Sequence, residues 1–551
     1  MSSEQGVDNG AARLQDEVGR AGHVRSSRAL VPAAMLLLAA GCTTVGPDFV
    51  KPEAPVAESW LEARDARLDT EAAEHRDWWQ AFEDPVLDRL VQNAYRQNLP
   101  LRIAGIRILE ARARLGVAVG NLFPQQQQAR AGASYVTGSE SNANTAAADL
   151  NFGSYDIGLD FGWEVDLWGK FRRAIQSADA DLFASIADYD DLLVSLTAQV
   201  ATAYVLIRTF EERLTIAREN VTIQERSLKI ADVRFRNGAT TELDVQQART
   251  LLRTTQSIIP PLEAGRRQAE NALSILLGMP PSDLQEVLGG TGSIPSAPAE
   301  VAIGMPAELL RRRPDVRRAE LQALSQSALI GVAQADLYPS FVLLGSIGFE
   351  AASGTSTTKS GNAGLDELFT GDSLAFVGGP RVTWNIFNYG RIKNNVRVQD
   401  ARFQQLMVSY QNTVLQAAQE VEDATVAFLR SQEQAAFLAD SAVAARRSVD
   451  LALIQYRDGA TDYTRVLQTQ QALASQQDQL TATRGDIARN LIAMYRALGG
   501  GWQLREGQDF VPEGTKAMMR ERTDWGGLLA PAALDVPPPE EPQPLFRRPD
   551  F

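Results

Sequence analysis

An internal repeat constrains the fold of this chain more than any other feature, because one structural plan must then occur twice. The segment Phe235–Thr240 recurs as Tyr456–Thr461, and the same spacing relates Trp163 to Trp384, Gly169 to Gly390, and Leu277-Gly278 to Leu498-Gly499. A slightly smaller spacing relates Gly116–Ala118 to Gly331–Ala333 and Leu122-Phe123-Pro124 to Leu337-Tyr338-Pro339. The sequence therefore predicts a tandem duplication whose spacing changes in one loop between strands.

Each repeat contains a long stretch without proline or glycine, Phe171–Asn237 and Arg391–Asp458. At 1.5 Å per residue, a helix of this length reaches roughly 100 Å. Charged residues interrupt both stretches, so neither predicts a membrane-spanning helix. An amphipathic helix on a globular core is the commoner alternative, but one ordinary domain would not cover helices this long. The apolar residues of the first stretch step by four and three, as in a coiled-coil seam: Leu196, Val200, Ala203, Ile207, Phe210, Leu214, Ala217 and Val221.

Strand-like segments lie between the predicted helices. From Tyr155 to Asp166, apolar residues alternate with polar residues or glycine, so two different faces are expected. A water-soluble sheet shows the same alternation if something covers its apolar face, but the length and aromatic content also suit a lipid-facing strand. The polar face would carry Asp156, Asp160 and Glu164, and would line a barrel lumen with mild cation preference. The other predicted strands are Gln125–Tyr135, Phe341–Phe349 and Ser373–Trp384.

Four membrane strands per chain are too few to close a barrel. Open sheet edges are excluded from lipid, because each unpaired N–H or C=O group there costs several kcal/mol. If the strands span a membrane, the chain must therefore associate. Three copies would form a twelve-stranded barrel, although the need to pair every backbone N–H and C=O group does not by itself select the number three.

The N-terminus predicts a lipoprotein leader. Arg25 and Arg28 precede the apolar stretch Ala29–Ala40, which is too short to cross a hydrocarbon core of about 30 Å. Cys42, the only cysteine, follows directly and resembles the lipidated cysteine of a bacterial lipobox. This resemblance implies removal of residues 1–41, and Thr43 implies sorting to the outer membrane. The alternative is an ordinary signal peptide followed by an incidental cysteine.

Composition argues against catalytic functions. Two histidines, His23 and His75, and one cysteine provide no zinc site and no disulfide. A net charge of −14 gives no electrostatic footprint for nucleic acid. A lipid-anchored enzyme would need a nucleophile or an acid–base cluster, and none is evident. We therefore expect no enzyme activity, no cofactor and no metal.

Several motifs resemble, in their order and spacing, those of the outer-membrane factor family, the TolC-like efflux ducts, and especially its NodT-type lipoproteins. They are Val45–Phe49, Trp78-Trp79 with Phe82 and Asp84-Pro85, Leu309–Val316 with Ala319-Glu320, Tyr456–Gly459 with Val466-Leu467, and Ala497–Trp502. The resemblance implies a mainly α-helical trimer in which a twelve-stranded barrel continues into an α-helical tunnel. It also implies a passive exit duct for drugs or small amphipathic compounds, with a periplasmic adaptor and an inner-membrane pump as partners. A periplasmic adaptor, the main rival, would carry one hairpin flanked by compact β domains.

In such a duct, Gly238 and Gly459 would form the turns at the hairpin tips, where glycine ends a helix with positive φ. Residues after these turns would line the periplasmic aperture. Family members often carry acidic residues six and nine positions after the second glycine, whereas this chain has Arg465 and Gln468 there. The remaining aperture candidates are Asp244, Asp462 and Tyr463, and Asp244 equally fits a helix surface near a cap.

The helix that returns from the first tip is expected to break at Pro260-Pro261, and the start of the helix near Pro100 is left open.

The predicted organisation of the chain has six parts. The parts are a leader (1–41), a lipid-linked equatorial segment (42–98), the first repeat (99–290), a linker (291–313), the second repeat (314–503) and a Pro-rich disordered tail (504–551).

Overall fold

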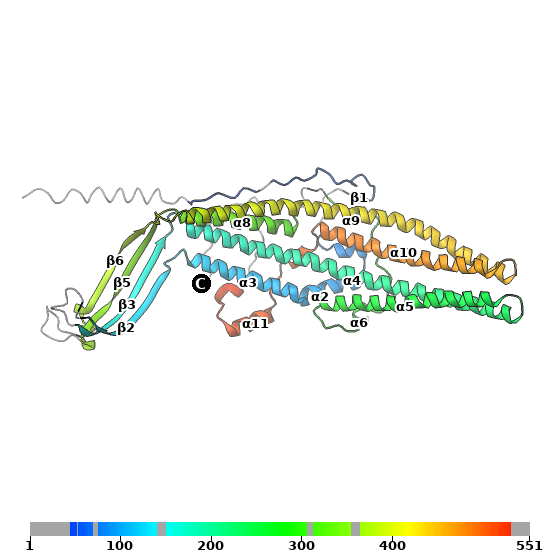
Figure 1. Ribbon diagram of the computed structural model, residues 1–551, viewed down its shortest axis with the longest axis horizontal. Helices are drawn as coiled ribbons and strands as arrows, with labels where there is room; N and C mark the ends of the chain where they lie inside the picture. Colours follow the sequence, from blue (N-terminus) through cyan, green and yellow to red (C-terminus); the bar gives the residue numbers. More distant parts are fainter. Residues whose placement is uncertain are drawn as a thin grey trace, which may run out of the picture.

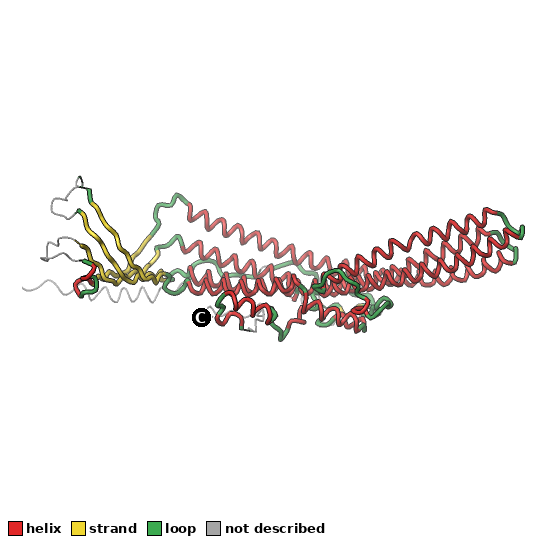
Figure 2. Tube along the Cα trace, turned by 90° about the horizontal axis from the view of Figure 1, so that it is seen from below, coloured by secondary structure: helices red, strands yellow, loops and turns green. Residues whose placement is uncertain are grey.

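The computed structural model describes residues 44–530, except 52, 70–74, 140, 142–149, 305, 307–311 and 354–363. The predicted leader, Cys42 and residues 531–551 lie outside the described residues. The molecule is elongated, with a four-stranded sheet at one end and two helical hairpin tips at the other (Figure 1). The strands leave the helical body at the end opposite the tips (Figure 2).

Two helices of 67 residues each, α4 (Lys170–Arg236) and α9 (Arg391–Arg457), run along the molecule. At the tips they are followed by helices of 35 residues each, α5 (Glu242–Leu276) and α10 (Tyr463–Ala497). The bounds of α9 and α10 follow those of α4 and α5 at the spacing that relates Trp163 to Trp384. The two predicted long helices are thus confirmed.

Shorter helices complete the body. Helices α3 (Leu99–Gly120) and α8 (Pro314–Ala335) precede the two strand pairs, and their bounds differ by the smaller of the two repeat spacings. The side chain of Asn98 caps α3 by accepting a hydrogen bond from the Leu101 N–H at 2.9 Å, so Pro100 lies in the first turn, where proline is tolerated. Three shorter elements lie nearby: η1 (Trp78–Phe82), α2 (Pro85–Gln97) and α6 (Gln285–Leu288).

The larger sheet has the order β2-β3-β5-β6, and all its neighbouring strands are antiparallel. Its strands are β2 (Gln126–Thr137), β3 (Asn151–Val165), β5 (Ser340–Ser353) and β6 (Leu374–Thr383). All four predicted strands are confirmed, with ends shifted by a few residues. A short parallel pair, β1 (Leu68–Asp69) and β4 (Val301–Ala302), joins the N-terminal segment to the linker.

The main core surrounds α4, which packs against α2, α3, α5, α8 and α10. Its largest fully buried side chains include Trp79, Phe183, Tyr204 and Phe428. In the described part of the chain, α4 is the one helix with the length and hydropathy of a membrane span, but 72% of its apolar window is buried inside the protein. This burial identifies α4 as a core helix.

The prediction of a disordered tail from residue 504 is wrong for residues 504–530. This segment continues from η4 (Trp502–Arg505) into α11 (Glu513–Arg522) and η5 (Gly526–Leu529), which pack beside α3. Arg505 forms a buried, long-range ion pair with Asp190 of α4, and within the segment Lys516, 1% exposed, pairs with Asp509. Such contacts leave no local compositional signal.

The predicted break at Pro260-Pro261 is also wrong, because α5 is continuous through both prolines. Each proline removes one backbone hydrogen bond, to the carbonyl four residues earlier. Both prolines are exposed, so the carbonyls of Gln256 and Ser257 lie on the solvent side, where water can satisfy them.

Candidate functional site: the open sheet and the helix tips

One face of the four-stranded sheet is apolar and exposed. The strand register places alternate residues of all four strands on this face. Exposed apolar side chains gathered on one face mark a surface that contacts a membrane or another protein. Its large exposed members are Tyr135, Ile157, Leu159, Phe161, Leu343, Ile347, Leu374, Phe376 and Val382.

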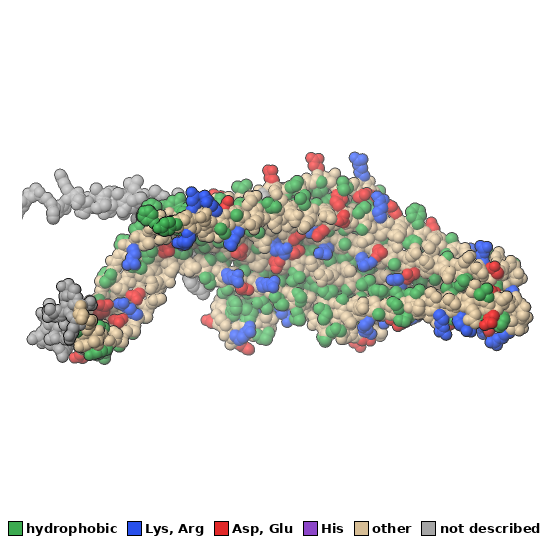
Figure 3. Space-filling model, in the orientation of Figure 1, with side chains coloured by type: hydrophobic (Ala, Val, Ile, Leu, Met, Phe, Trp, Pro, Cys, Tyr) green, Lys and Arg blue, Asp and Glu red, His purple; other side chains and the backbone are tan. Residues whose placement is uncertain are grey.

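The opposite face carries the predicted acidic residues Asp156, Asp160 and Glu164. Arg130 of β2 lies among them, with its Nε 3.8 Å from a carboxylate oxygen of Asp156 and 3.8 Å from one of Asp160. The same guanidinium donates to Glu350 of β5 at 3.3 Å. Figure 3 shows acidic and basic side chains together on the sheet.

Sequence reasoning overlooked three charged members of this polar face: Arg130, Glu350 and Arg381. Arg130 stands within a predicted strand, so its alternation was a usable signal. Glu350 lies one residue beyond the predicted end of its strand. The face on which Arg381 lies follows from the pairing of β6 with β5, which the sequence alone does not define. The face therefore combines four acidic and two basic side chains in the described strands.

The two edges of the sheet, β2 and β6, each have one neighbour in the described chain. Their outer N–H and C=O groups thus form two open rows. In water such edges promote association, and in lipid they are strongly unfavourable. The sheet thus combines an exposed apolar face with two open edges.

Aromatic residues mark the junction between strands and helices. Trp163 Nε1 donates to the Leu122 carbonyl at 3.1 Å, and Trp384 Nε1 donates to the Leu337 carbonyl at 3.0 Å. These two hydrogen bonds are equivalent in the two repeats. Trp168 stacks on Tyr338 with ring centroids 4.6 Å apart. Tryptophan and tyrosine in this position suit the interface of a membrane.

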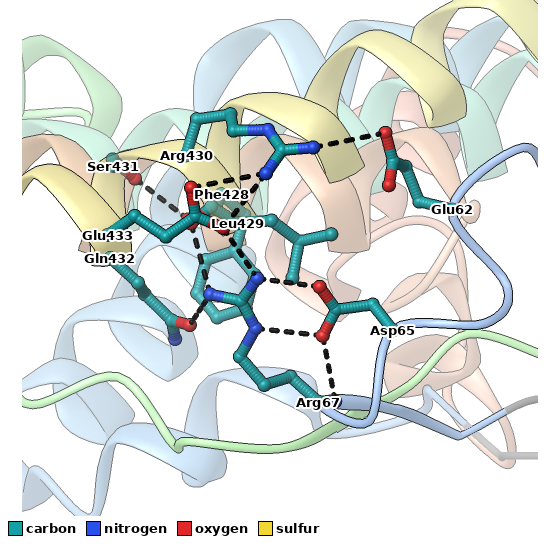
Figure 4. Close-up of polar contacts among 9 residues, drawn as sticks. All are labelled: Glu62, Asp65, Arg67, Phe428, Leu429, Arg430, Ser431, Gln432 and Glu433. Atoms are coloured by element: carbon teal, nitrogen blue, oxygen red, sulfur yellow. Dashed lines mark hydrogen bonds and ion pairs between the residues drawn. The ribbon is translucent and has the colours of Figure 1, made fainter.

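The N-terminal segment, residues 44–51 and 53–69, extends along α8 and α9 (Figure 1). Arg67 fixes its far end: the guanidinium donates to Asp65 at 2.6 and 2.8 Å, to Glu433 at 3.1 Å and to the Leu429 carbonyl at 3.2 Å (Figure 4). Hydrogen bonds from Arg67 lower the pKa of Asp65 to about 2. The segment following Cys42 is thus attached to the second long helix.

The hairpin turns lie at Gly238 (φ 70°) and Gly459 (φ 77°). Each glycine follows the C-cap of a long helix and adopts the left-handed conformation that side chains disfavour. Both turns lie at the end of the molecule opposite the sheet (Figure 1).

A polar cluster connects the two tips. Tyr456 of α9 donates its hydroxyl proton to Asp244 of α5 at 3.2 Å, and Thr240 also donates to this carboxylate. Arg234 of α4 lies over the Tyr456 ring, 4.7 Å from its centroid, and donates to the Tyr456 and Arg457 carbonyls at 2.5 and 2.9 Å. Burial raises the pKa of Tyr456. The cluster therefore ties the first hairpin to the second.

The five predicted aperture residues occupy different environments. Asp244 is half-buried in the polar cluster, while Arg465 and Gln468 are exposed. Asp462 is exposed and caps α10, accepting a hydrogen bond from the Arg465 N–H at 3.3 Å. Tyr463 corrects the prediction: it is 1% exposed, because its ring packs inside the tip against Tyr456, 5.3 Å between centroids. Its side chain is not part of the surface.

Among the described residues, no group of histidine, cysteine, aspartate or glutamate has an arrangement that would hold a metal ion.

Comparisons with known proteins agree with this architecture. A family model described as outer membrane efflux protein matches the chain twice, over residues 90–279 and 305–500. The pyoverdine export outer membrane protein OpmQ of Pseudomonas putida is 30% identical over 86% of this chain and 97% of its own length. The probable outer membrane lipoprotein SilC of Salmonella typhimurium is 29% identical over 86% and 98%.

Among solved structures, the outer-membrane channel OprN aligns with a TM-score of 0.77 and 32% identity, covering 83% of this chain and 99% of that one. The match is therefore to whole proteins and not to one shared module. Because the family model matches both repeats and more than half of the sequence, this chain belongs to the outer membrane efflux protein family.

Proposed function

We propose that three copies of the chain form a twelve-stranded barrel in the outer membrane, continued by an α-helical tunnel, which serves as the passive exit duct of an efflux system. The observation that carries this proposal is the four-stranded sheet with an exposed apolar face and two open edges. Such a sheet satisfies its backbone groups in lipid only by closing with other copies.

The direction of the strands supports closure by identical copies. All neighbouring strands alternate in direction, so the edge strands β2 and β6 are antiparallel to each other. When β6 of one copy joins β2 of the next, the antiparallel alternation continues around the barrel. The even strand number matches that of bacterial single-chain barrels.

The equivalent helix bounds in the two halves support a tandem duplication. Two hairpins per chain then give the trimer six similar hairpins around one axis. The tips would form the periplasmic aperture and the docking site of an adaptor, with Gly238 and Gly459 at the turns and Asp244, Asp462, Arg465 and Gln468 nearby. The aperture would carry arginine where family members often carry acidic residues.

Cys42 is proposed as the lipid anchor at the outer membrane. The hydrogen bond from the Val45 N–H to the Trp168 carbonyl, at 3.0 Å, would hold this anchor beside the barrel end of the helices. The remaining partners are a periplasmic adaptor and an inner-membrane pump. The cargo class is small amphipathic compounds, in keeping with a relative named for pyoverdine export.

The polar sheet face is proposed to line the lumen. Its four acidic and two basic side chains per copy favour cations over anions. Asp156, Asp160 and Glu164 supply three of these acidic groups.

Two measurements on the detergent-solubilised protein test the proposal. Mass determination is expected to give a trimer about 100 Å or more in length, as the helices require. Planar-bilayer recordings are expected to show channels with cation preference. A stable monomer or failure to insert would contradict the channel, and anion preference would contradict the assignment of the lumen face.

A further inference from the structure

Resting on the trimeric channel proposed above, we infer that Arg381 of each copy forms an ion pair with Asp156 of the neighbouring copy, across Gly132. This pair lies at the seam where β6 of one copy meets β2 of the next. Three such pairs would set the register of barrel closure.

The two faces of the sheet restrict how β6 and β2 can meet. Pairing with β5 places the apolar face of β6 at even-numbered residues such as Phe376 and Val382, and the polar face at odd-numbered Arg381. On β2 the apolar face holds odd-numbered residues such as Tyr135, and the polar face holds even-numbered ones. A seam shifted by one residue would turn apolar side chains into the lumen, so only every second register is allowed.

The seam between β3 and β5 within one chain provides a template for the seam between chains, because both join a first-repeat strand to a second-repeat strand. The equivalent Trp163 and Trp384 hydrogen bonds align the repeats at this end of the sheet. Inside the chain, Val165 lies opposite Phe341. The larger repeat spacing maps Val165 onto residue 386, and the smaller one maps Phe341 onto residue 126. The transferred pairing therefore places residue 386 opposite residue 126 of the next copy. It lies one residue away from a face-consistent register, because the smaller spacing carries Phe341 of the apolar face onto Gln126 of the polar face.

Two face-consistent registers flank the transferred pairing, one residue to either side. In one register Arg381 lies directly opposite Arg130 of the neighbouring copy, and in the other it lies opposite Gly132. Two guanidinium groups directly opposite each other are destabilising on a sheet face. The first register therefore carries a penalty that the second lacks.

Gly132 is a receptive position for an incoming arginine. It lies opposite Asp156 on β3, and the Asp156 carboxylate leans over it, so that a Cβ at residue 132 would overlap Asp156 Oδ1. The nearest basic atom to Asp156 in the described part of its own chain, Arg130 Nε, is 3.8 Å away. This is too far for a direct hydrogen bond, and Asp160 shares the atom at the same distance. Arg381 is exposed on the open edge. In the Gly132 register, Arg381 of one copy lies opposite Gly132 of the next, and Asp156 lies on the other side of Gly132. The guanidinium can therefore reach the Asp156 carboxylate.

Disulfide cross-linking tests the register. Val377, Gly379 and Ser134 all lie on the polar face, and the two edge strands of one chain are separated by β3 and β5. The Gly132 register places Gly379 opposite Ser134 of the next copy, whereas the Arg130 register places Val377 there. Directly opposite residues have Cβ atoms about 5 Å apart and diagonal ones about 7–8 Å, and only the former suit a disulfide.

The double variant Gly379→Cys, Ser134→Cys is expected to give covalent trimers on non-reducing gels, and its matched control Val377→Cys, Ser134→Cys to give several-fold less. The reverse pattern, or no cross-linking by either variant while each remains trimeric by mass, would overturn the inference. A wild-type chain that is not trimeric would instead contradict the proposed function.

A charge-neutralising cycle tests the ion pair. Arg381→Gln and Asp156→Asn are each expected to lower the dissociation temperature of the trimer, and the double variant to lower it no further than the more severe single one. The control cycle combines Arg381→Gln with Asp160→Asn. Asp160 is not part of the inferred ion pair, so the two decreases in dissociation temperature should add. If the effects on the dissociation temperature add in both cycles, the inferred ion pair is wrong, whereas the proposed trimeric channel is unaffected.

Discussion

At the scale of single residues, the tip cluster shows how one hydroxyl couples two hairpins that are far apart in sequence. Tyr456 and Tyr463 stack edge to face, but only Tyr456 donates a hydrogen bond, to Asp244. The buried Tyr463 hydroxyl has no partner among the described residues. The two tyrosines therefore form a matched pair for experiments.

Tyr456→Phe removes the hydroxyl while keeping the ring under Arg234. A hydrogen bond to a charged group contributes roughly 1.5–3 kcal/mol, so the connection between the tips should weaken by about this amount. We expect more frequent opening in planar-bilayer recordings. Tyr463→Phe is the control and should leave opening unchanged, since an unsatisfied hydroxyl contributes no stabilisation. Equal effects of both changes would contradict a latch through Asp244.

A second residue-scale prediction concerns His75, which is buried beside Tyr495, with 5.5 Å between the ring centroids. Burial, with a smaller contribution from Arg312, lowers its pKa from 6.5 to about 4. The unfolded chain then binds a proton more readily than the folded one. The stabilisation is fully present above pH 6.5 and is lost as the pH falls toward 4, by roughly 3 kcal/mol at most.

Thermal unfolding at several pH values, with His75→Gln as the comparison, measures this loss. The wild-type chain should lose more stability than the variant between pH 6.5 and 4. Parallel pH profiles would show that His75 does not titrate as inferred.

At the scale of elements, the C-terminal segment is held by a few long-range contacts. Arg505 and Asp190 pair at 7% and 2% side-chain exposure, and Arg505 also lies over the rings of Trp502 and Phe510. Near the other end, Arg520 and Glu513 pair on the surface at 50% and 71% exposure. The same type of interaction thus occurs in two very different environments.

Arg505→Ala should reduce the free energy of unfolding by about 3–5 kcal/mol, because it removes the bidentate guanidinium from a buried carboxylate. Arg520→Ala should reduce it by less than about 1 kcal/mol. Denaturant unfolding, or protease cleavage within residues 504–530, provides the measurement. A small effect of Arg505→Ala would mean that the segment is held mainly by the apolar contacts of Val511, Met519 and Leu529.

At the scale of the whole molecule, the two sheet faces differ in the environment they require. Leu159 is 59% exposed on the apolar face, whereas Gln128 of β2 lies on the polar face opposite Asp160. An arginine on a lipid face destabilises a barrel by roughly 2–4 kcal/mol near the bilayer midplane.

Leu159→Arg should therefore reduce the amount of folded oligomer recovered from the outer membrane, while Gln128→Arg should be tolerated and should weaken cation preference. Heat-modifiability on gels and bilayer recordings report the two effects. If the Leu159→Arg variant forms the folded oligomer and the Gln128→Arg variant does not, the lipid-facing and lumen-facing sides of the sheet are assigned the wrong way round.

The periodic parts of this protein could be predicted from its amino-acid pattern alone. Absence of proline and glycine predicted α4 and α9, alternation predicted β3 with the other strands as its partners, and the repeat placed Gly238 and Gly459 at equivalent turns. These features depend on neighbours within a few residues, so composition and spacing report them directly. Three features emerged only from packing and strand pairing. Residues 504–530 are folded, Tyr463 is buried, and Arg130, Glu350 and Arg381 join the acidic face. Each of these depends on partners distant in the chain, such as Arg505 and Asp190, whose proximity arises from packing and strand register.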